Sequence, residues 1–534
     1  MAAIVPCAAA AARQRRGARP ATSAPMNVVA APRALSSLRS PVAQPLPWLL
    51  AFALAHVALR VATSPALKWD EAEQMLWSQQ LALGYGPQPP LYTWLQWGMN
   101  QLLGPSVLAL SALKHGLMAL GFVCMWLAGR ELLGPRGAWW ASASMLLLPP
   151  IGWYSVRDQT HSILVTSMAC AAWWLLLRIV RRRQRRDFAL LGLVCAAGLL
   201  AKYSFALVIG AMAAAALTVP EARRALLSRG WWWAPLVGTL VVLPHALWLL
   251  SHLQEATTGT LGKMQIRPES GLATGLLSLA DGVGGMLLLW ALVALWAFRA
   301  AWWRRPLTPA QPWAQQLFWR YLALTLLALL AMVLVAGVTS FKGRWMQPLL
   351  CMVPLAAFAA RPELQQHPRA RRYSGAVLVM AAVILLMAYV RPWLSGARGD
   401  ADELNHPVIE LAAELTQRGY DGRSPIIGAD HMMAGMLRTR FPQARVAACH
   451  PDDGAVPDCV AAHTARAEAA GQGWLLISRD DRLPPDWWDA ALAGIGARPV
   501  QSLRLPFRKV RAGMAPAHYQ FVWQPATAAA VTAR

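Results

Sequence analysis

The chain has 534 residues, of which 56% are hydrophobic and only 14% are charged, and it contains 27 tryptophans. A soluble globular protein of this length carries more charge, so the composition excludes that class and favours a polytopic α-helical membrane protein. The formal net charge of +24 does not indicate a nucleic-acid partner, because the arginines gather in short loops between apolar segments, which is the positive-inside pattern. We therefore expect membrane lipids as partners and no nucleic acid.

Residues 1–45 are rich in Ala, Pro and Ser and contain arginines but no acid. This composition predicts a disordered, basic, cytoplasmic N-terminal tail, with a cleaved presequence as the alternative.

Residues 46–392 are expected to form the membrane domain. The arginine-rich loops, above all 181–186, are placed in the cytoplasm, which puts the loop 64–104 outside. The long apolar stretch 188–219 is interpreted as two short helices that turn near Lys202 and Tyr203, because this keeps both flanking basic loops inside. The pattern predicts about eleven transmembrane helices: 46–63, 106–128, 138–154, 162–180, two within 188–219, 231–250, 276–298, 317–338, 345–359 and 374–390.

Residues 393–534 have a different texture, with acids and bases nearly in balance. Apolar residues at helical spacing predict helices over 404–418 and 432–440, and short apolar runs predict strands over 425–429 and 473–478. We expect a small α/β extracytoplasmic domain. In a cell inner membrane, the tail would then be cytoplasmic and this C-terminal domain periplasmic.

Two cysteines, Cys449 and Cys459, bracket a polar loop in this domain. An oxidising compartment favours a disulfide between them. The alternative is a metal site that uses Cys449, His450 and Asp452, although no CxxC spacing supports it. The other cysteines within apolar segments are interpreted as packing residues: Cys124, Cys170, Cys195 and Cys351.

Three carboxylates, Asp70, Glu71 and Glu73, cluster in the outer loop just after the first apolar segment. Acids beside a membrane are costly and are usually retained for function, so this cluster is a candidate for a general base. The competing interpretation is structural. Asp70 would cap a helix over 71–83, Glu71 would bond to the backbone or to a cation, and Glu73 would belong to a solvated face.

Several short motifs of this chain resemble glycosyltransferase family 39 of the GT-C membrane glycosyltransferases. This family comprises the dolichyl-phosphate-mannose protein mannosyltransferases, and its bacterial branch includes the lipid A aminoarabinose transferase. The resemblance covers about 46–390. The chain departs from the family pattern at two places. Gln88 stands where bacterial relatives often carry a charged residue or His, and residues 159–162 also differ from the family pattern. The motifs are Trp69-Asp70-Glu71-Ala72-Glu73, Leu76-Trp77-Ser78, Leu81-Ala82-Leu83-Gly84-Tyr85, Pro89-Pro90-Leu91, Arg157-Asp158, Lys202-Tyr203 and Lys342-Gly343-Arg344-Trp345.

The resemblance implies an enzyme that takes a sugar from a polyprenyl-phosphate donor and passes it to a lipid, glycan or protein acceptor at the outer face, with inversion. It implies catalytic roles for Asp70, Glu71 and Asp158, and Asp70 is the candidate base. Cations at the outer ends of helices would stabilise the leaving phosphate. We predict no cofactor and no metal ligands, with a divalent cation left open. The expected substrate- and phosphate-binding residues are Arg157, Lys202, Tyr203, Lys342, Arg344 and Tyr85.

Each of these residues has a simpler interpretation. Asp158 could pair with Arg157 or Lys202, Lys202 could extend to the membrane interface, and Lys342 and Arg344 could be interfacial anchors.

A second class of function, a transporter or lipid flippase, also uses charges at helix ends. The sequence shows no internal repeat and no matched pair of interrupted helices, and its acids gather in one outer loop.

Overall fold

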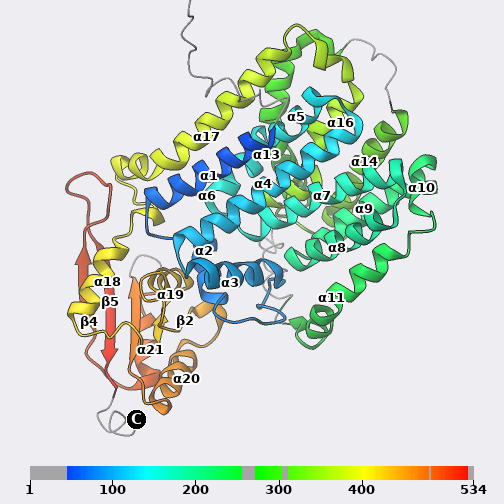
Figure 1. Ribbon diagram of the computed structural model, residues 1–534. Helices are drawn as coiled ribbons and strands as arrows, with labels where there is room; N and C mark the ends of the chain where they lie inside the picture. The colour runs from blue at the N-terminus through cyan, green and yellow to red at the C-terminus, as the bar shows by residue number, and fades with distance from the viewer. Residues whose placement is uncertain (1–44, 255, 257–270, 304–310, 480–482, 527–534) are drawn as a thin grey trace, which may run out of the picture. The chain divides into compact units, whose positions relative to one another are not determined.

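The computed structural model describes residues 45–254, 256, 271–303, 311–479 and 483–526. The predicted N-terminal tail, apart from Pro45, lies outside the described residues. Residues 45–398 are mainly helical, and residues 403–524 combine short helices with a sheet (Figure 1).

The mainly helical part alternates long apolar helices with short ones. Its elements are α1 (Pro45–Thr63), α2 (Trp69–Trp77), α3 (Leu91–Leu103), α4 (Val107–Leu132), α5 (Pro135–Ala143), η1 (Ser144–Leu147), η2 (Pro150–Tyr154), α6 (Ser155–Asp158), α7 (His161–Arg182), α8 (Arg185–Ala201), α9 (Phe205–Thr218), α10 (Pro220–Leu226), α11 (Trp233–Ser251), α13 (Leu272–Phe298), η3 (Arg299–Trp302), α14 (Pro312–Leu334), α15 (Gly343–Leu350), α16 (Val353–Ala360), η4 (Pro362–Gln366) and α17 (Ala370–Arg398).

Seven of the described helices are long and apolar enough to cross a membrane, namely α1, α4, α7, α11, α13, α14 and α17; α9 and α10, bent by 113°, form an eighth candidate. The other predicted segments are also helical, but they are short or broken. Residues 138–154 are interrupted near Pro149 and Pro150, which cannot continue a regular helix. The total of eleven crossings therefore stays a prediction.

The apolar stretch 188–219 does contain the two predicted short helices, α8 and α9. They are separated at Lys202, whose backbone is extended (φ −164°, ψ 129°). The turn leaves the Lys202 and Tyr203 side chains at a helix junction, where they line a cavity described below.

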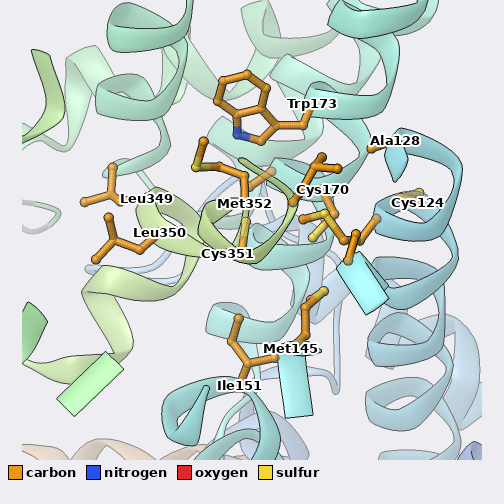
Figure 2. Close-up of a cluster of buried hydrophobic side chains, with 14 of the residues drawn as sticks. Cys124, Ala128, Met145, Ile151, Cys170, Trp173, Leu349, Leu350, Cys351 and Met352 are labelled. Atoms are coloured by element: carbon orange, nitrogen blue, oxygen red, sulfur yellow. The ribbon is translucent and has the colours of Figure 1, made fainter. Parts of the chain in front are cut away.

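One region of the core of the helical part lies between α4, η1, η2, α7 and the end of α15. Figure 2 shows side chains from these elements meeting around Cys170 and Cys351. The thiols of Cys124, Cys170 and Cys351 are free and buried, and Cys195 is free and half-buried. These four cysteines therefore pack as predicted, as small apolar side chains.

The C-terminal part is built on a five-stranded sheet in the order β2-β1-β3-β5-β4, in which β1 is parallel to β2 and β3 and β5 is antiparallel to β3 and β4. The predicted helices and strands are present, whereas β2, β4 and β5 were missed. Its elements are η5 (Glu403–Asn405), α18 (Val408–Gln417), β1 (Ile426–Gly428), α19 (His431–Arg438), β2 (Val446–Ala448), η6 (Pro451–Asp453), α20 (Val456–Ala469), β3 (Trp474–Arg479), α21 (Trp487–Ile495), β4 (Gln501–Leu505) and β5 (Ala517–Gln524).

Side chains alternate between the two faces of this sheet, as strand geometry requires. Ile426 and Leu475 pack with α18 and α19 on one face, and Ile427 and Leu476 pack with α20 and α21 on the other. Cys449 and Cys459 form the predicted disulfide, so their sulfur atoms are not available for the alternative metal site.

Helix α19 also packs against α2, so the sheet part contacts the segment that follows α1 in the helical part directly (Figure 1). A Cβ atom at Gly435 would lie 2.3 Å from the backbone oxygen of Ala72. The contact thus requires glycine. The Arg438 guanidinium donates hydrogen bonds to the backbone oxygens of Met75 and Ser78.

Candidate active site

Helix α2 presents the three predicted carboxylates, but it begins and ends differently from expectation. Its N-cap is Lys68, so Asp70 lies inside the first turn and is not the cap. Glu71 provides the capping contact, since its carboxylate accepts a hydrogen bond of 3.1 Å from the Lys68 backbone. The helix stops at Trp77 and not at Leu83, because Arg438 and the Ser78 hydroxyl satisfy its last carbonyl groups.

A cavity of about 330 Å³ opens beside the first turn of α2. Five predicted site residues line it. Asp70 lies in α2, Lys202 and Tyr203 lie at the junction between α8 and α9, and Lys342 and Arg344 lie at the start of α15. Apolar side chains from α9, α14 and α15, among them Leu207, Leu329 and Leu349, complete the wall. The cavity therefore combines two carboxylates, those of Asp70 and Glu73, with several cations and an apolar flank.

Asp70 lies half-buried at this cavity. Burial raises the pKa of Asp70, and the charges of Arg344, Lys114 and Lys202 act in the opposite direction. The Asp70 backbone N–H points at Asp158, with 3.4 Å between the nitrogen and a carboxylate oxygen. Burial, followed by the charge of Asp70, raises the pKa of Asp158 to about 6. The two acids therefore titrate as an interacting pair.

Asp158 forms no ion pair with any described residue, so the simpler interpretation of a pair with Arg157 or Lys202 is wrong. Instead, the Lys202 ammonium donates a hydrogen bond of 3.2 Å to the Ser162 hydroxyl. Lys342 precedes α15 and Arg344 lies in its first turn. The three cations at the cavity thus come from two helix junctions that are far apart in the chain.

Glu71 faces away from this cavity and is held by charges. Its carboxylate lies 2.6 Å from the Arg60 guanidinium and 3.6 Å from the Lys114 ammonium, and its side chain is 2% exposed. Burial alone would raise the pKa of Glu71, but Arg60, Lys114 and the Lys68 backbone hydrogen bond outweigh it and lower the pKa to about 2. The expected catalytic role of Glu71 stays untested, and its contacts are those of a structural anion.

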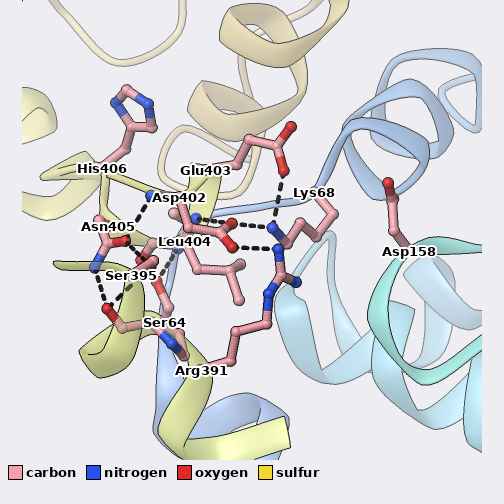
Figure 3. Close-up of polar contacts among 12 residues, drawn as sticks. Ser64, Lys68, Asp158, Arg391, Ser395, Asp402, Glu403, Leu404, Asn405 and His406 are labelled. Carbon is pink, nitrogen blue, oxygen red and sulfur yellow. Dashed lines mark hydrogen bonds and ion pairs between the residues drawn. The ribbon is translucent and has the colours of Figure 1, made fainter. Parts of the chain in front are cut away.

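A second charged cluster joins the start of α2 to the C-terminal part. Figure 3 shows the Lys68 ammonium bonded to Asp402 and Glu403, with Arg391 bonded to Asp402. The Arg391–Asp402 distance is 2.5 Å. Burial would raise the pKa of Asp402, but Lys68 and Arg391 lower it. The cluster was not predicted from the sequence, because Lys68 lies more than 300 residues from its partners Asp402 and Glu403.

Two predicted binding residues do not line this cavity. The Tyr85 hydroxyl donates to the Gln80 carbonyl at 2.7 Å and accepts from the Ala82 backbone at 3.0 Å, which braces the loop after α2. Arg157 is exposed and lines a different, smaller cavity. Tyr203 does line the main cavity, and its hydroxyl lies 3.2 Å from the His245 ring.

Several residues of the cavity wall were not predicted as site residues. These residues include Trp69, His161 and Trp345, and Glu73, one of the three carboxylates considered for a general base, also lines the cavity. His161 contacts Gln74 of α2 at 3.2 Å and so joins α7 to the acidic helix.

Lys114 is buried and faces Glu71. The sequence could have indicated this role, because Lys114 is a lone lysine within the predicted span 106–128.

The acids at the cavity do not form a group of three potential metal ligands. Among the described residues, such a group occurs at Cys449, Cys459 and His463, where the two cysteines are joined as a disulfide.

Comparisons with known proteins agree with this architecture. A family model described as dolichyl-phosphate-mannose-protein mannosyltransferase matches residues 87–248. The chain is 30% identical over 485 residues to the lipopolysaccharide core galacturonosyltransferase RgtA of Rhizobium johnstonii, covering 87% of this chain and 94% of that protein. It is 29% identical over 474 residues to the related RgtB of the same organism, covering 86% and 93%.

The fold is similar to that of ArnT from Cupriavidus metallidurans, whose crystal structure contains undecaprenyl phosphate. The TM-score is 0.57 at 13% identity, and the match covers 89% of this chain and 97% of that chain. At this identity the similarity concerns the fold alone.

Proposed function

Because the chain belongs to glycosyltransferase family 39, the dolichyl-phosphate-mannose-protein mannosyltransferase family of GT-C membrane enzymes, we propose that it transfers a sugar from a polyprenyl-phosphate carrier to an envelope glycolipid. The proposal rests on one observation: the Asp70 carboxylate shares a cavity of about 330 Å³ with Lys202, Lys342 and Arg344. A base and a cation cluster at one site are what displacement of a lipid phosphate requires.

In the proposed reaction, an acceptor hydroxyl attacks the anomeric carbon of the sugar while Asp70 takes the hydroxyl proton. The bond between the anomeric carbon and the phosphate oxygen breaks, and the polyprenyl phosphate leaves with the bonding electrons. Lys202, Lys342 and Arg344 stabilise the charge that develops on that phosphate. A single in-line displacement inverts the anomeric configuration.

The apolar flank of the same cavity supports a lipid donor. Leu207, Leu329 and Leu349 form one side of it, and an apolar wall beside a polar head group suits a polyprenyl chain. We further propose eleven crossings of the inner membrane, with a cytoplasmic N-terminus and with α2 and the C-terminal α/β domain in the periplasm. The arginine-rich loop 181–186 supports this orientation.

The names of two relatives give the first sugar and the first acceptor to test. RgtA and RgtB are named for transfer of galacturonic acid to the lipopolysaccharide core. We therefore place galacturonic acid first among the candidate sugars and lipopolysaccharide first among the acceptors.

The test is transfer of label from a polyprenyl-phosphate sugar to lipopolysaccharide in membranes that carry the full chain. Membranes that lack the chain serve as the blank, and galacturonic acid, mannose and aminoarabinose donors are compared. We expect labelled glycolipid from at least one donor. Vesicles that move the donor across the membrane without any new covalent bond would favour a transporter or flippase instead.

A further inference from the structure

A second, smaller cavity lies next to the proposed catalytic centre. It has a volume of about 40 Å³ and is lined by side chains of α1, α4, η2, α6 and α17, with Leu404 at one edge. It lies near α2, because Arg60, which lines it, is bonded to Glu71, whereas the adjacent Asp70 lines the larger cavity. Its volume is roughly three times what one water molecule needs, which is enough for a small charged group.

The lining of this cavity is strongly basic. Three guanidinium groups, those of Arg60, Arg157 and Arg391, line it together with the imidazoles of His56 and His115. None of the described residues that line it is acidic. Arg60 and Arg391 are each held by an acid outside the lining, Glu71 and Asp402. The cavity therefore faces three guanidinium groups, two of which are held in place by ion pairs.

Several hydrogen-bonding groups of this cavity lack partners. Both ring nitrogens of His56 and the Nε2 atom of His115 are buried and form no hydrogen bond among the described residues. The two rings are stacked at 5.0 Å. Arg157 makes no hydrogen bond or ion pair with a described residue. Buried polar groups normally have partners, so this set of groups suits a ligand rich in acceptor oxygens.

We propose that this cavity is an oxyanion subsite that binds a phosphate or carboxylate group of the acceptor glycolipid. The proposal rests on the proposed function above. The phosphate of the donor already has Lys202, Lys342 and Arg344 in the larger cavity, so a second basic cavity suits the second substrate. Helix α6 carries both Arg157 and Asp158, and Asp158 adjoins Asp70. An acceptor held at Arg157 would thus lie beside the proposed base. Guanidinium groups match phosphate and carboxylate oxygens in a bidentate geometry.

The test measures binding of acceptor probes to the purified full chain in detergent. One pair of probes is bisphosphorylated lipid A and the same lipid after removal of its phosphates. The other pair is lipopolysaccharide with intact carboxylates and the same material with its carboxylates reduced. The variant is Arg157→Gln, which removes an exposed side chain without a partner and should leave the fold intact. The control is Arg398→Gln, an exposed arginine at the end of α17.

We expect the wild type to bind one intact probe at least tenfold more tightly than its treated counterpart, and the pair that shows this difference identifies the anion as phosphate or carboxylate. Arg157→Gln should reduce the preference to threefold or less, and Arg398→Gln should keep it. An unchanged preference in Arg157→Gln, or no preference in the wild type, would overturn the subsite. Binding of undecaprenyl phosphate to the wild type and to Arg157→Gln is measured in parallel. An equal loss of its binding in Arg157→Gln would assign the cavity to the donor and would also overturn the proposal. Transfer by the wild type in membranes tests the proposed function separately.

Discussion

The two neighbouring acids of α2, Asp70 and Glu71, lie in regions of opposite character. Glu71 is in contact with Arg60 and Lys114 and accepts a backbone hydrogen bond, so its charge is compensated within the protein. Asp70 faces a cavity that it shares with cations from two distant junctions, and its neighbour Asp158 is another acid. From this difference we propose that Glu71 stabilises the fold and that Asp70 takes part in the reaction.

The pKa values express the same contrast. Compensation by Arg60 and Lys114 lowers the pKa of Glu71 to about 2 despite burial. Burial raises the pKa of Asp70, and burial with the charge of Asp70 raises the pKa of Asp158 to about 6. Raised values make a carboxylate a better proton acceptor near neutral pH, so the environment of the pair suits a base.

The largest expected effect is that of Asp70→Asn. The amide keeps the shape of the carboxylate but cannot take a proton, and general-base catalysis typically contributes about 10²–10⁴-fold. We expect transfer in membranes with matched protein levels to fall by about that factor, while the melting temperature of the purified chain stays close to that of the wild type. Transfer near the wild-type rate would remove Asp70 from the chemistry and direct attention to Asp158.

The opposite pattern is expected of Glu71→Gln. The change leaves Arg60 and Lys114 without their anion, and breaking a buried pair costs about 3–5 kcal/mol. Thermal unfolding should show a marked loss of stability, with a smaller loss of transfer per folded molecule than in Asp70→Asn. The control is Glu414→Gln, which breaks a half-exposed pair with Arg418 at 3.6 Å and should change stability by less than about 1 kcal/mol. Similar stability in the two variants would contradict a structural role for Glu71.

Arg344→Gln tests the role proposed for the cations of the larger cavity. Loss of a charge-assisted hydrogen bond costs about 1.5–3 kcal/mol, which corresponds to about a 10- to 150-fold rise in the apparent dissociation constant of the lipid donor. We expect the KM for donor to rise by about that factor, with little change in thermal stability. Arg371→Gln, an exposed arginine at the start of α17, should leave the KM for donor unchanged. Equal effects in the two variants would argue against a phosphate site at α15.

The support that α19 gives to α2 is tested by Gly435→Ala. The added methyl group would meet the Ala72 backbone at 2.3–2.7 Å, and overpacking of this kind costs about 1–3 kcal/mol. The variant should be less stable and should also lose transfer, because the helix that carries Asp70 must shift. Gly98→Ala on α3, where a Cβ atom meets nothing within 4 Å, should be neutral or slightly stabilising. Full transfer in Gly435→Ala would mean that α2 does not depend on this contact.

The sequence predicted elements whose signal is local. The helices of the membrane part and the break near Lys202 follow from apolar length and arginine placement, and the disulfide follows from Cys449 and Cys459 in the C-terminal part. The site was predicted less fully. The cluster of Lys68 with Asp402 and Glu403 joins residues more than 300 positions apart, so no local pattern indicates it.

Strands β4 and β5 were missed for a similar reason. Strand β5 pairs antiparallel with β3, and β4 pairs antiparallel with β5. The side chains of both strands are only partly buried, which weakens the apolar signal in the sequence. The expected helix over 71–83 was too long because its stop depends on Arg438, a contact from the other part of the chain. Tertiary partners thus decide the details that local patterns leave open.

The smallest expected effect concerns pH and sharpens the contrast between the two acids. The base must be ionised to accept a proton, and its neighbour Asp158 has a pKa of about 6. We expect kcat/KM to fall as the pH drops through about 6, as the pair takes up a proton. In Asp158→Asn the repelling charge is absent, so the pKa of Asp70 should fall and the acidic limb should move to lower pH by about one unit, the scale of a coupled pair.

The pH profile of wild type and Asp158→Asn in membranes checks this shift, with Asp400→Asn, a change at an exposed acid, as the control. A limb that stays in place in Asp158→Asn would show that the two carboxylates do not interact in the working enzyme. A limb that moves to higher pH would contradict the sign of the interaction, because removal of a neighbouring negative charge favours ionisation of the acid that remains.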